Sequence, residues 1–145
     1  MRFMIIRKAD PDTEAGKLPD RELAATMMRY HEEMARHLKV LDGAGLKPTS
    51  QGARVRWPGG KPAVVDGPFA ETKELIAGYT LVEADSLEQV LEWAKRWPAE
   101  CDGGDGLELE VRPLYELEDF GDVFDDELRA RHDRIGLGGK AAGAA

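Results

Sequence analysis

Cysteine is almost absent from the sequence, and basic residues are in the minority. Cys101 is the single cysteine among 145 residues, so the chain holds no internal disulfide and no cage of thiolate metal ligands. The 20 lysines and arginines are outnumbered by 28 aspartates and glutamates, and the resulting net charge of -8 repels the phosphates of nucleic acids. We therefore expect a protein of a reducing compartment that does not bind nucleic acid directly.

Long hydrophobic runs are also missing. No stretch approaches the roughly 18 apolar residues that cross a bilayer, and the opening run from Met1 to Arg7 is too short and too interrupted by charge for a signal peptide. We therefore expect a cytoplasmic protein that does not enter a membrane. Hydrophobic residues still make up 42% of the chain, which is enough for one packed core, and the sequence predicts one domain followed by a tail.

Hydrophobic periodicity predicts two helices. From Asp20 onward, apolar residues recur at steps of three and four, which predicts an amphipathic helix that ends near Asp42. This stripe consists of Leu23, Met27, Tyr30, Met34, Leu38 and Leu41. Ser86 and Gln89 form a capping box, which predicts a second helix that runs to Pro98.

Alternating and continuous apolar runs predict five strands, over residues 3–7, 53–57, 63–66, 75–84 and 107–112. The second and third form a hairpin, because Pro58-Gly59-Gly60 turns the chain between them. The order is β-α-β-β-β-α-β, which predicts an α+β protein with an antiparallel sheet on a ferredoxin-like plan that carries the hairpin as an insert.

The strand over 75–84 carries apolar bulk on both faces, with Tyr79 and Leu81 on one and Ile76 and Val82 on the other. One face needs helices to cover it and the other needs a partner. We therefore expect a homodimer in which two sheets pack face to face.

The end of the chain differs in composition. We divide the chain into a domain over 1–114 and an acidic extension over 115–145, which carries Tyr115, Phe120 and Phe124. A short helix is predicted from about Asp125 to Ile135, followed by a frayed end rich in glycine and alanine.

The most distinctive segment is DGPFAETKELIAGY, over residues 66–79. It resembles the signature of the YCII-related proteins of the DGPF type, and the likeness extends over roughly residues 1–120. This resemblance implies a dimeric α+β barrel of ferredoxin-like topology, and some relatives are associated with extracytoplasmic-function sigma factors. A His-Asp pair in a cleft has been proposed for a related YCII protein, and only its aspartate has a counterpart in the motif, as Asp66.

The motif also supplies the candidate site. Gly67 and Pro68 end a strand sharply, which presents the carboxylate of Asp66 at the strand end, where sites are often built. Asp66 is the candidate catalytic base, or else an aspartate that stabilises the turn. The residues expected around a ligand are Phe69, Thr72, Lys73, Glu74 and Tyr79.

Histidines give a weaker signal. His31 is a second candidate catalytic residue, but His31 and His37 are six residues apart, which is poor spacing for a zinc helix. The Asp102-Gly103-Gly104-Asp105-Gly106 segment lacks the pattern of a calcium loop. We expect neither a metal nor another cofactor.

Three functions remain open at this stage. The first is binding of a small polar or anionic metabolite in a cleft near the DGPF loop. The second is a cofactor-independent acid/base enzyme with Asp66 as general base, assisted by Tyr79 or His31. The third is a regulatory interaction with a sigma factor through the acidic extension.

Overall fold

Four antiparallel strands form the central sheet of the computed structural model, which describes residues 1–70 and 72–139. These strands are β1 (Arg2–Lys8), β2 (Lys39–Gly45), β5 (Ile76–Glu83) and β6 (Leu109–Pro113), in the spatial order β2-β5-β1-β6. Each neighbouring pair is antiparallel. With a helix after β1 and another after β5, this order gives the predicted α+β fold of ferredoxin-like topology.

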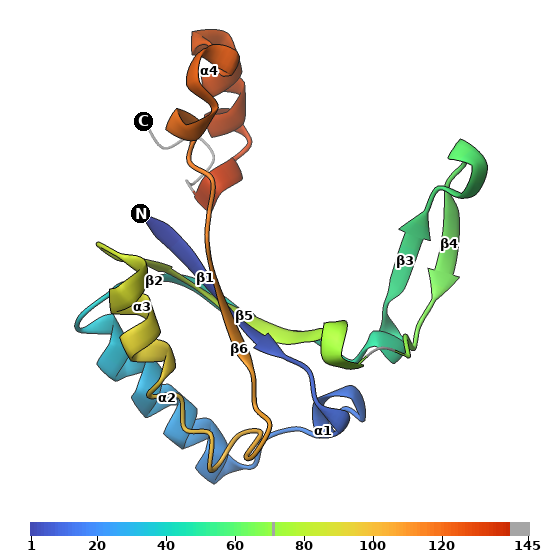
Figure 1. The fold of residues 1–145 in the computed structure, drawn as a ribbon, viewed down its shortest axis with the longest axis vertical. Helices are drawn as coiled ribbons and strands as arrows, with labels where there is room; N and C mark the ends of the chain where they lie inside the picture. The colour runs from blue at the N-terminus through green and yellow to red at the C-terminus, as the bar shows by residue number, and fades with distance from the viewer. Residues whose placement is uncertain (71, 140–145) are drawn as a thin grey trace.

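Two helices cover one face of the sheet, α2 (Arg21–Ala35) and α3 (Leu87–Ala94) (Figure 1). Asp20 caps α2 by accepting a hydrogen bond from the Leu23 amide, and Ser86 caps α3 in the same way through Gln89. The side chains that are fully buried between the helices and the sheet are Phe3, Ile5, Met34, Val82 and Val90.

The end of the first predicted helix is wrong. Helix α2 ends at Ala35, and the amides of His37 and Leu38 both donate to the carbonyl of Met34 to close its last turn. The next residues form β2, which pairs with β5 and places Val40 against the core. The spacing of Met34, Leu38 and Leu41 imitates a helical stripe, but Gly43 and Gly45 disfavour a continued helix, and the pairing with β5 makes the segment a strand. The sheet therefore has one strand more than predicted.

The predicted hairpin is confirmed as β3 (Ala53–Arg56) paired with β4 (Ala63–Asp66). It forms a separate two-stranded sheet, inserted between β2 and β5, and extends away from the central sheet (Figure 1). A short helix, α1 (Pro11–Glu14), follows β1 and is capped by Asp10. Contacts from Glu14 to the Thr49 amide and hydroxyl join α1 to the base of the hairpin.

The C-terminal unit, which we define as residues 115–139, contains a 3-10 segment (Leu117–Val123), helix α4 (Asp126–Arg134) and a 3-10 turn (Leu137–Gly139). The short helix predicted from about Asp125 to Ile135 is thus confirmed, with these two residues as its caps. The division of the chain at residue 114 stays a prediction. Within the described part of the chain, no helix combines the length and the apolar character that a membrane span needs.

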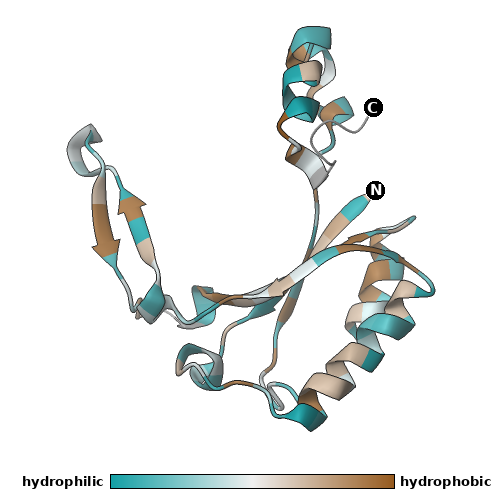
Figure 2. Ribbon diagram, turned by 180° about the vertical axis from the view of Figure 1, so that it is seen from behind, coloured by the Kyte–Doolittle hydropathy of each residue, from teal (hydrophilic) through white to brown (hydrophobic). Residues whose placement is uncertain are grey.

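The sheet face opposite α2 and α3 carries no covering element from the described residues (Figures 1 and 2). Side chains alternate along β1, so Phe3 and Ile5 are buried under the helices while Met4 and Ile6 on the other face are half-buried. Tyr79 and Leu81 of β5 lie in register with Ile6 and Met4 and are also half-buried. We call this side of the sheet the open face.

Candidate functional site

A cavity with a volume of about 480 Å³ lies between α2 and the β2-β5 edge of the sheet. We call it the helix–sheet cavity. This volume is within the usual range for small-molecule sites. The side chains and backbone that line it come from α2 (Met27, Met28, His31), from the sheet (Ile5, Arg7, Val40, Asp42, Gly43, Ala44, Gly45, Ala77, Gly78, Tyr79, Thr80) and from the segment after α3 (Trp97).

Glycines allow the two strands beside this cavity to approach each other closely. A β-carbon at Gly78 would stand 2.8 Å from the carbonyl oxygen of Ala44, so the close approach of β2 and β5 requires glycine there. At Gly43 a β-carbon would lie 3.3 Å from the carbonyl oxygen of Tyr79, which is also tight. Small residues therefore form part of the sheet side of the cavity, namely Gly43, Ala44, Gly45, Ala77 and Gly78.

His31 is the polar group of the cavity with the best-defined geometry. Its Nδ1 lies 2.9 Å from the carbonyl oxygen of Met27, and its Nε2 lies 3.2 Å from Oγ1 of Thr80. A carbonyl can only accept, so Nδ1 carries the hydrogen in the neutral ring. Nε2 is then the unprotonated nitrogen, and it accepts from the Thr80 hydroxyl. The structure thus fixes both the tautomer and the orientation of the imidazole.

Aromatic rings hold His31 from the core side. Its ring makes edge contacts with Tyr30, at a centroid distance of 5.2 Å, and with Trp97, at 6.0 Å. The hydroxyl of Tyr30 donates to the carbonyl of Trp93 at 2.7 Å, and burial raises the pKa of Tyr30 well above its ordinary value. Tyr30 is therefore a neutral structural group, and it does not compete with His31 for a proton near neutral pH.

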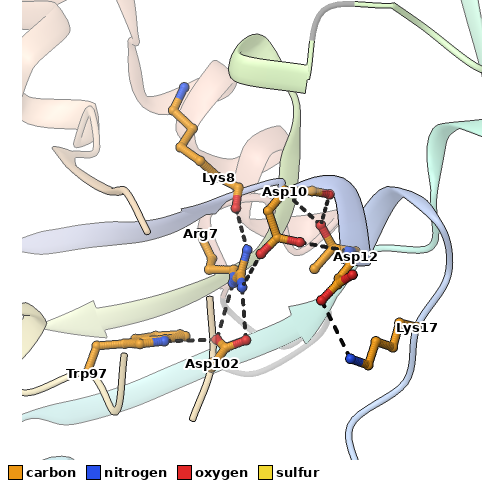
Figure 3. A network of polar contacts seen from close by, with 8 residues as sticks. Arg7, Lys8, Asp10, Asp12, Lys17, Trp97 and Asp102 are labelled. Carbon is orange, nitrogen blue, oxygen red and sulfur yellow. Dashed lines mark hydrogen bonds and ion pairs between the residues drawn. The ribbon is translucent and has the colours of Figure 1, made fainter. Parts of the chain in front are cut away.

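A buried polar network positions Trp97 (Figure 3). Asp102 accepts a hydrogen bond from the indole Nε1 of Trp97 at 2.9 Å and two from the guanidinium of Arg7. Arg7 also pairs with Asp10 at 3.0 Å. Burial opposes the charge of Arg7, but the hydrogen bonds to Asp102 and Asp10 outweigh it and raise the pKa of the guanidinium. The two carboxylates therefore neutralise this cation, and it serves as a structural link between β1 and the loop after α3.

Tyr79 borders the cavity but its phenol lies on the open face of β5, opposite to Thr80. Its hydroxyl donates to Oδ2 of Asp42 at 3.1 Å, and this hydrogen bond raises the pKa of the phenol. Asp42 follows an irregularity in the pairing of β2 with β5. The hydroxyls of Tyr79 and Thr80 lie on opposite faces of β5, and His31 contacts the one on Thr80. The phenol of Tyr79 and the imidazole of His31 therefore do not approach one atom of a ligand from the same side.

The DGPF motif lies at the base of the hairpin, and none of the residues from Asp66 to Phe69 lines the helix–sheet cavity. Asp66 is exposed at the end of β4. The amide of Gly67 donates to the carbonyl of Gly52, and a β-carbon at Gly67 would stand 1.7 Å from the carbonyl oxygen of Thr49. The motif therefore closes the base of the hairpin against residues 49–52, which explains its glycine.

Phe69 contributes to the same closure. Its amide donates to the Thr49 hydroxyl at 3.1 Å, and the guanidinium of Arg54 lies 3.8 Å from the centre of its ring. This stacking of a cation on an aromatic ring joins the loop to β3. Phe69 is half-buried and lies outside the hydrophobic core.

The other predicted ligand residues are dispersed. Lys73 and Glu74 are exposed on a 3-10 turn (Thr72–Glu74), and the side chain of Thr72 lies outside the described part of the structure. Lys73 borders a second, more polar cavity of about 660 Å³ beside Arg7 and Asp10. The structure therefore brings His31 and Tyr79 to one cavity, places Lys73 at another, and leaves Asp66 and Phe69 at the hairpin.

Sequence reasoning missed the hydrogen-bond partners that the sheet supplies to His31 and Tyr79. Thr80, the partner of His31, was hidden in a strand pattern, and Asp42, the partner of Tyr79, was assigned to the end of a helix. The glycines of Asp42–Gly45 and of Ala77–Tyr79 were the available signal, because glycine inside two strands marks a close backbone approach. Among the described residues, no three His, Cys, Asp or Glu side chains converge as metal ligands. That no cofactor is needed stays a prediction.

The topology and the cavity define this chain as a ferredoxin-like α+β domain with a pocket between its first long helix and its sheet. Residues 1–115 match the model of the YCII-related domain, and the chain belongs to that family, as the DGPF segment predicted.

Two known proteins are similar to this chain. An uncharacterised protein of Rhizobium meliloti is 39% identical over 75 residues, which cover 52% of this chain and 57% of that protein. The match thus spans little more than half the length of either protein. A solved structure of 5-chloro-2-hydroxyhydroquinone dehydrochlorinase from Burkholderia phenoliruptrix, in complex with 2,5-dihydroxybenzoquinone, is 15% identical with a TM-score of 0.45, over 82% of this chain and 98% of that one.

Proposed function

We propose that the helix–sheet cavity binds a small organic molecule that carries a polar or anionic group on an apolar frame. The observation that carries this proposal is the fixed imidazole of His31, whose Nε2 faces Thr80 in a cavity that is also lined by apolar side chains, among them Met27, Met28 and Trp97. A few placed polar groups in an apolar pocket are typical of small-molecule sites. This places the proposed ligand beside α2 rather than beside Asp66.

The chemistry of His31 limits the ligand. The neutral ring accepts a hydrogen bond at Nε2 from a hydroxyl, and the protonated ring donates one to a carboxylate or an enolate. The hydroxyl of Thr80 can donate to the neutral ring or accept from the protonated ring, so neither protonation state leaves a buried atom unpaired. Arg7 does not supply the charge for an anion, because Asp10 and Asp102 already pair with it.

Proton transfer is a second candidate function, and the Nδ1 contact of His31 favours it. A histidine whose Nδ1–H is held by a carbonyl presents its unprotonated Nε2 in a defined direction, which is what a general base requires, and here a ligand would take the place of the Thr80 hydroxyl at that nitrogen. In such a reaction Nε2 would remove a proton from a hydroxyl or an acidic C–H of the ligand and return it to the product. Asp66 is too exposed and too far outside the cavity lining to be the base in this version.

The test follows the imidazole nitrogens directly by NMR during titration with benzoate and with phenol, two probes with an apolar ring and one polar group. Binding in the cavity should shift the Nε2 resonance of His31. The Nε2 resonance of His37, which is exposed just after α2, should not change. His31→Gln should lower the affinity for the probes by about tenfold, as expected for loss of a buried hydrogen bond. His37→Gln is the matched control and should bind as the wild type does.

Native mass spectrometry of freshly purified protein provides the complementary measurement, because a retained molecule appears as an extra mass that is lost on denaturation. Probes that bind without moving the His31 resonances, or that bind His31→Gln as tightly as the wild type, would place the ligand elsewhere. An unchanged spectrum with both probes and no retained mass would count against a ligand site in this cavity.

We also infer that two copies associate through their open faces to form an α+β barrel. The support is the half-buried row of Met4, Ile6, Tyr79 and Leu81, which no element of the described chain covers. An apolar sheet face of this kind is stable in water when a second layer covers it. Sedimentation equilibrium tests this, and Leu81→Asp should convert the dimer into a monomer, whereas Glu83→Asp at the exposed end of β5 should not.

A further inference from the structure

The hairpin extends from the central sheet as an arm, and the contacts that hold it among the described residues lie at its base, from Glu14 to Thr49 and from Phe69 to Arg54. Two strands alone are marginally stable in water, and a third layer is usually needed. Yet Val55, Trp57 and Val64 are 53%, 63% and 69% exposed, although the register places Val55 opposite Val64. Apolar side chains this exposed on an isolated two-stranded ribbon indicate a surface that another surface covers.

The hairpin is also basic, in contrast to the chain as a whole. Arg54, Arg56 and Lys61 lie on it, against the single acidic residue Asp66 at its base, while the chain carries a net charge of -8. Arg54 is engaged with the ring of Phe69. Arg56 and Lys61 are exposed toward the tip, so the free end of the arm is both cationic and apolar.

The C-terminal unit has the opposite charge and the same apolar character. Between residues 116 and 127 it contains seven acidic residues and no basic one. Tyr115 is 77% exposed and stacks at 5.2 Å on Phe120, which in turn lies 5.4 Å from Phe124. Asp122 and Asp126 are exposed around this aromatic cluster.

The two surfaces stand at opposite ends of the sheet. The hairpin leaves the end where Gly45 pairs with Gly78, and the C-terminal unit follows the end where Phe3 pairs with Pro113. Arg2, whose side chain shares the open face with Met4, holds the unit by a 2.8 Å ion pair to Glu116 and by a hydrogen bond to the carbonyl of Gly138. Both structures rise on the side away from α2 and α3 (Figures 1 and 2).

We propose that the basic hairpin of one copy binds the acidic C-terminal unit of a second copy, twice in each dimer. This rests on the association of open faces proposed above and adds which parts meet at its two ends. A two-fold axis in the plane between two open faces can run along the strands or across them. An axis along the strands brings hairpin to hairpin and acidic unit to acidic unit. An axis across the strands brings each hairpin to the partner's acidic unit.

Charge selects the second arrangement. If the two hairpins of the dimer faced each other, Arg56 and Lys61 would meet the same two cations of the partner, and this repulsion disfavours that arrangement. In the other arrangement they meet Asp122 and Asp126, while Val55, Trp57 and Val64 cover the aromatic cluster. The apolar side chains of the hairpin and those of the aromatic cluster are then buried by one symmetric assembly.

A charge-swap experiment tests the contact. The hairpin variant carries Arg56→Glu and Lys61→Glu, and the acidic-unit variant carries Asp122→Lys and Asp126→Lys. Arg54 is left intact because its guanidinium stacks on the ring of Phe69. Asp119 and Asp125 are left intact because their carboxylates accept hydrogen bonds from the backbone amides of Glu116 and Leu128. The matched control for the hairpin variant is Arg36→Glu with Lys95→Glu, which lowers the net charge by the same amount but at the ends of the helices on the covered side.

Sedimentation equilibrium at low salt should show that each double variant alone dimerises about tenfold or more weakly than the wild type, since both contacts of its homodimer become repulsive. An equal mixture of the two should regain wild-type affinity, because every hairpin then faces a complementary unit. The chain with all four substitutions should also regain it, and the control should remain at wild-type affinity. Circular dichroism checks that each variant is folded.

The outcomes separate the two proposals. A wild type that stays monomeric overturns the open-face dimer and this contact with it. A wild type that dimerises, with variants that dimerise equally well, leaves the dimer and overturns the contact. Variants that are weakened but are not rescued in the mixture overturn it too, because the substituted surfaces then do not face each other.

Discussion

The carbonyl oxygen of Ala44 lies 2.8 Å from the point where a β-carbon at Gly78 would stand. This contact joins the two strands that form the wall of the helix–sheet cavity, and it involves backbone on both sides. Gly78→Ala should therefore push β2 away from β5 and lower the free energy of unfolding by about 1–3 kcal/mol, the usual cost of overpacking. Urea unfolding followed by circular dichroism measures this change.

The control for this prediction is Gly45→Ala, one strand away. A β-carbon there would lie 4.0 Å from the nearest backbone atom, the carbonyl oxygen of Ala77, so it meets only ordinary van der Waals contact. We expect this variant to unfold within about 0.5 kcal/mol of the wild type. Equal destabilisation by both substitutions would show that the cost comes from the loss of glycine as such and not from the Ala44 contact.

The second prediction concerns the protonation site of neutral His31. Because Met27 offers only a carbonyl, the hydrogen belongs on Nδ1, and it should stay there when Thr80 is replaced by valine. The 15N shifts of the ring at high pH distinguish the two tautomers. A neutral ring with its hydrogen on Nε2 in the wild type would mean that the Met27 contact does not control the imidazole, and would weaken the case for a general base.

The framework of the fold was predictable because its signals are local. Ser86 caps a helix with its own neighbour Gln89, and the hairpin is specified by alternation around Pro58-Gly59-Gly60. Strand β2 was missed because Leu38 and Leu41 continue the spacing of α2, while the glycines that disfavour a helix come only later. Its pairing with β5 depends on residues about forty positions away, which no local pattern contains.

The site was harder to predict than the fold. The DGPF motif is unusual in sequence, and this drew attention to Asp66, but the structure explains its glycine by the carbonyl of Thr49. The contact of His31 with Thr80 joins residues 49 positions apart across the helix–sheet interface. Only the packing of α2 on the sheet brings them together, so the orientation of the imidazole was beyond sequence reasoning, although His31 itself was named.

The third prediction concerns Asp102, which accepts hydrogen bonds from Arg7 and Trp97 at once. Asp102→Ala removes both and leaves the 7% exposed Arg7 with Asp10 as its remaining carboxylate. We expect a loss of about 2–4 kcal/mol in the free energy of unfolding, since a buried charge loses a partner. Asp105→Ala, in the same loop but exposed, should have little effect, and a similar loss in both variants would argue against the network as the cause.

The same substitution should also affect the cavity. Trp97 lines it and contacts the ring of His31, so releasing its indole from Asp102 frees a wall of the proposed site. The intrinsic fluorescence of Asp102→Ala should change even under conditions where the protein stays folded. The probes used against His31 should then bind more weakly to Asp102→Ala than to Asp105→Ala.

The last prediction concerns how the C-terminal unit is held at different pH. Hydrogen bonds from Arg2 lower the pKa of Glu116 below its ordinary value of 4.5, although burial opposes this shift. A lowered pKa means that the ionised carboxylate stabilises the folded arrangement, so its contribution is complete above pH 4.5 and is lost as the pH falls through the lowered pKa. A partly exposed pair of this kind contributes about 1 kcal/mol.

We expect the unit to stay attached from pH 5 to 8 and to loosen in more acidic solution, which hydrogen exchange of α4 can follow. Glu116→Gln should lower the protection of the α4 amides at neutral pH, relative to their intrinsic exchange rates, to the level of acidic solution, and Glu118→Gln, which is more exposed, should not. If the α4 amides of the wild type are equally protected at pH 3 and pH 7, each relative to the intrinsic rate at that pH, the Arg2 contact does not hold the unit, and the apolar contacts of Phe120 and Phe124 do.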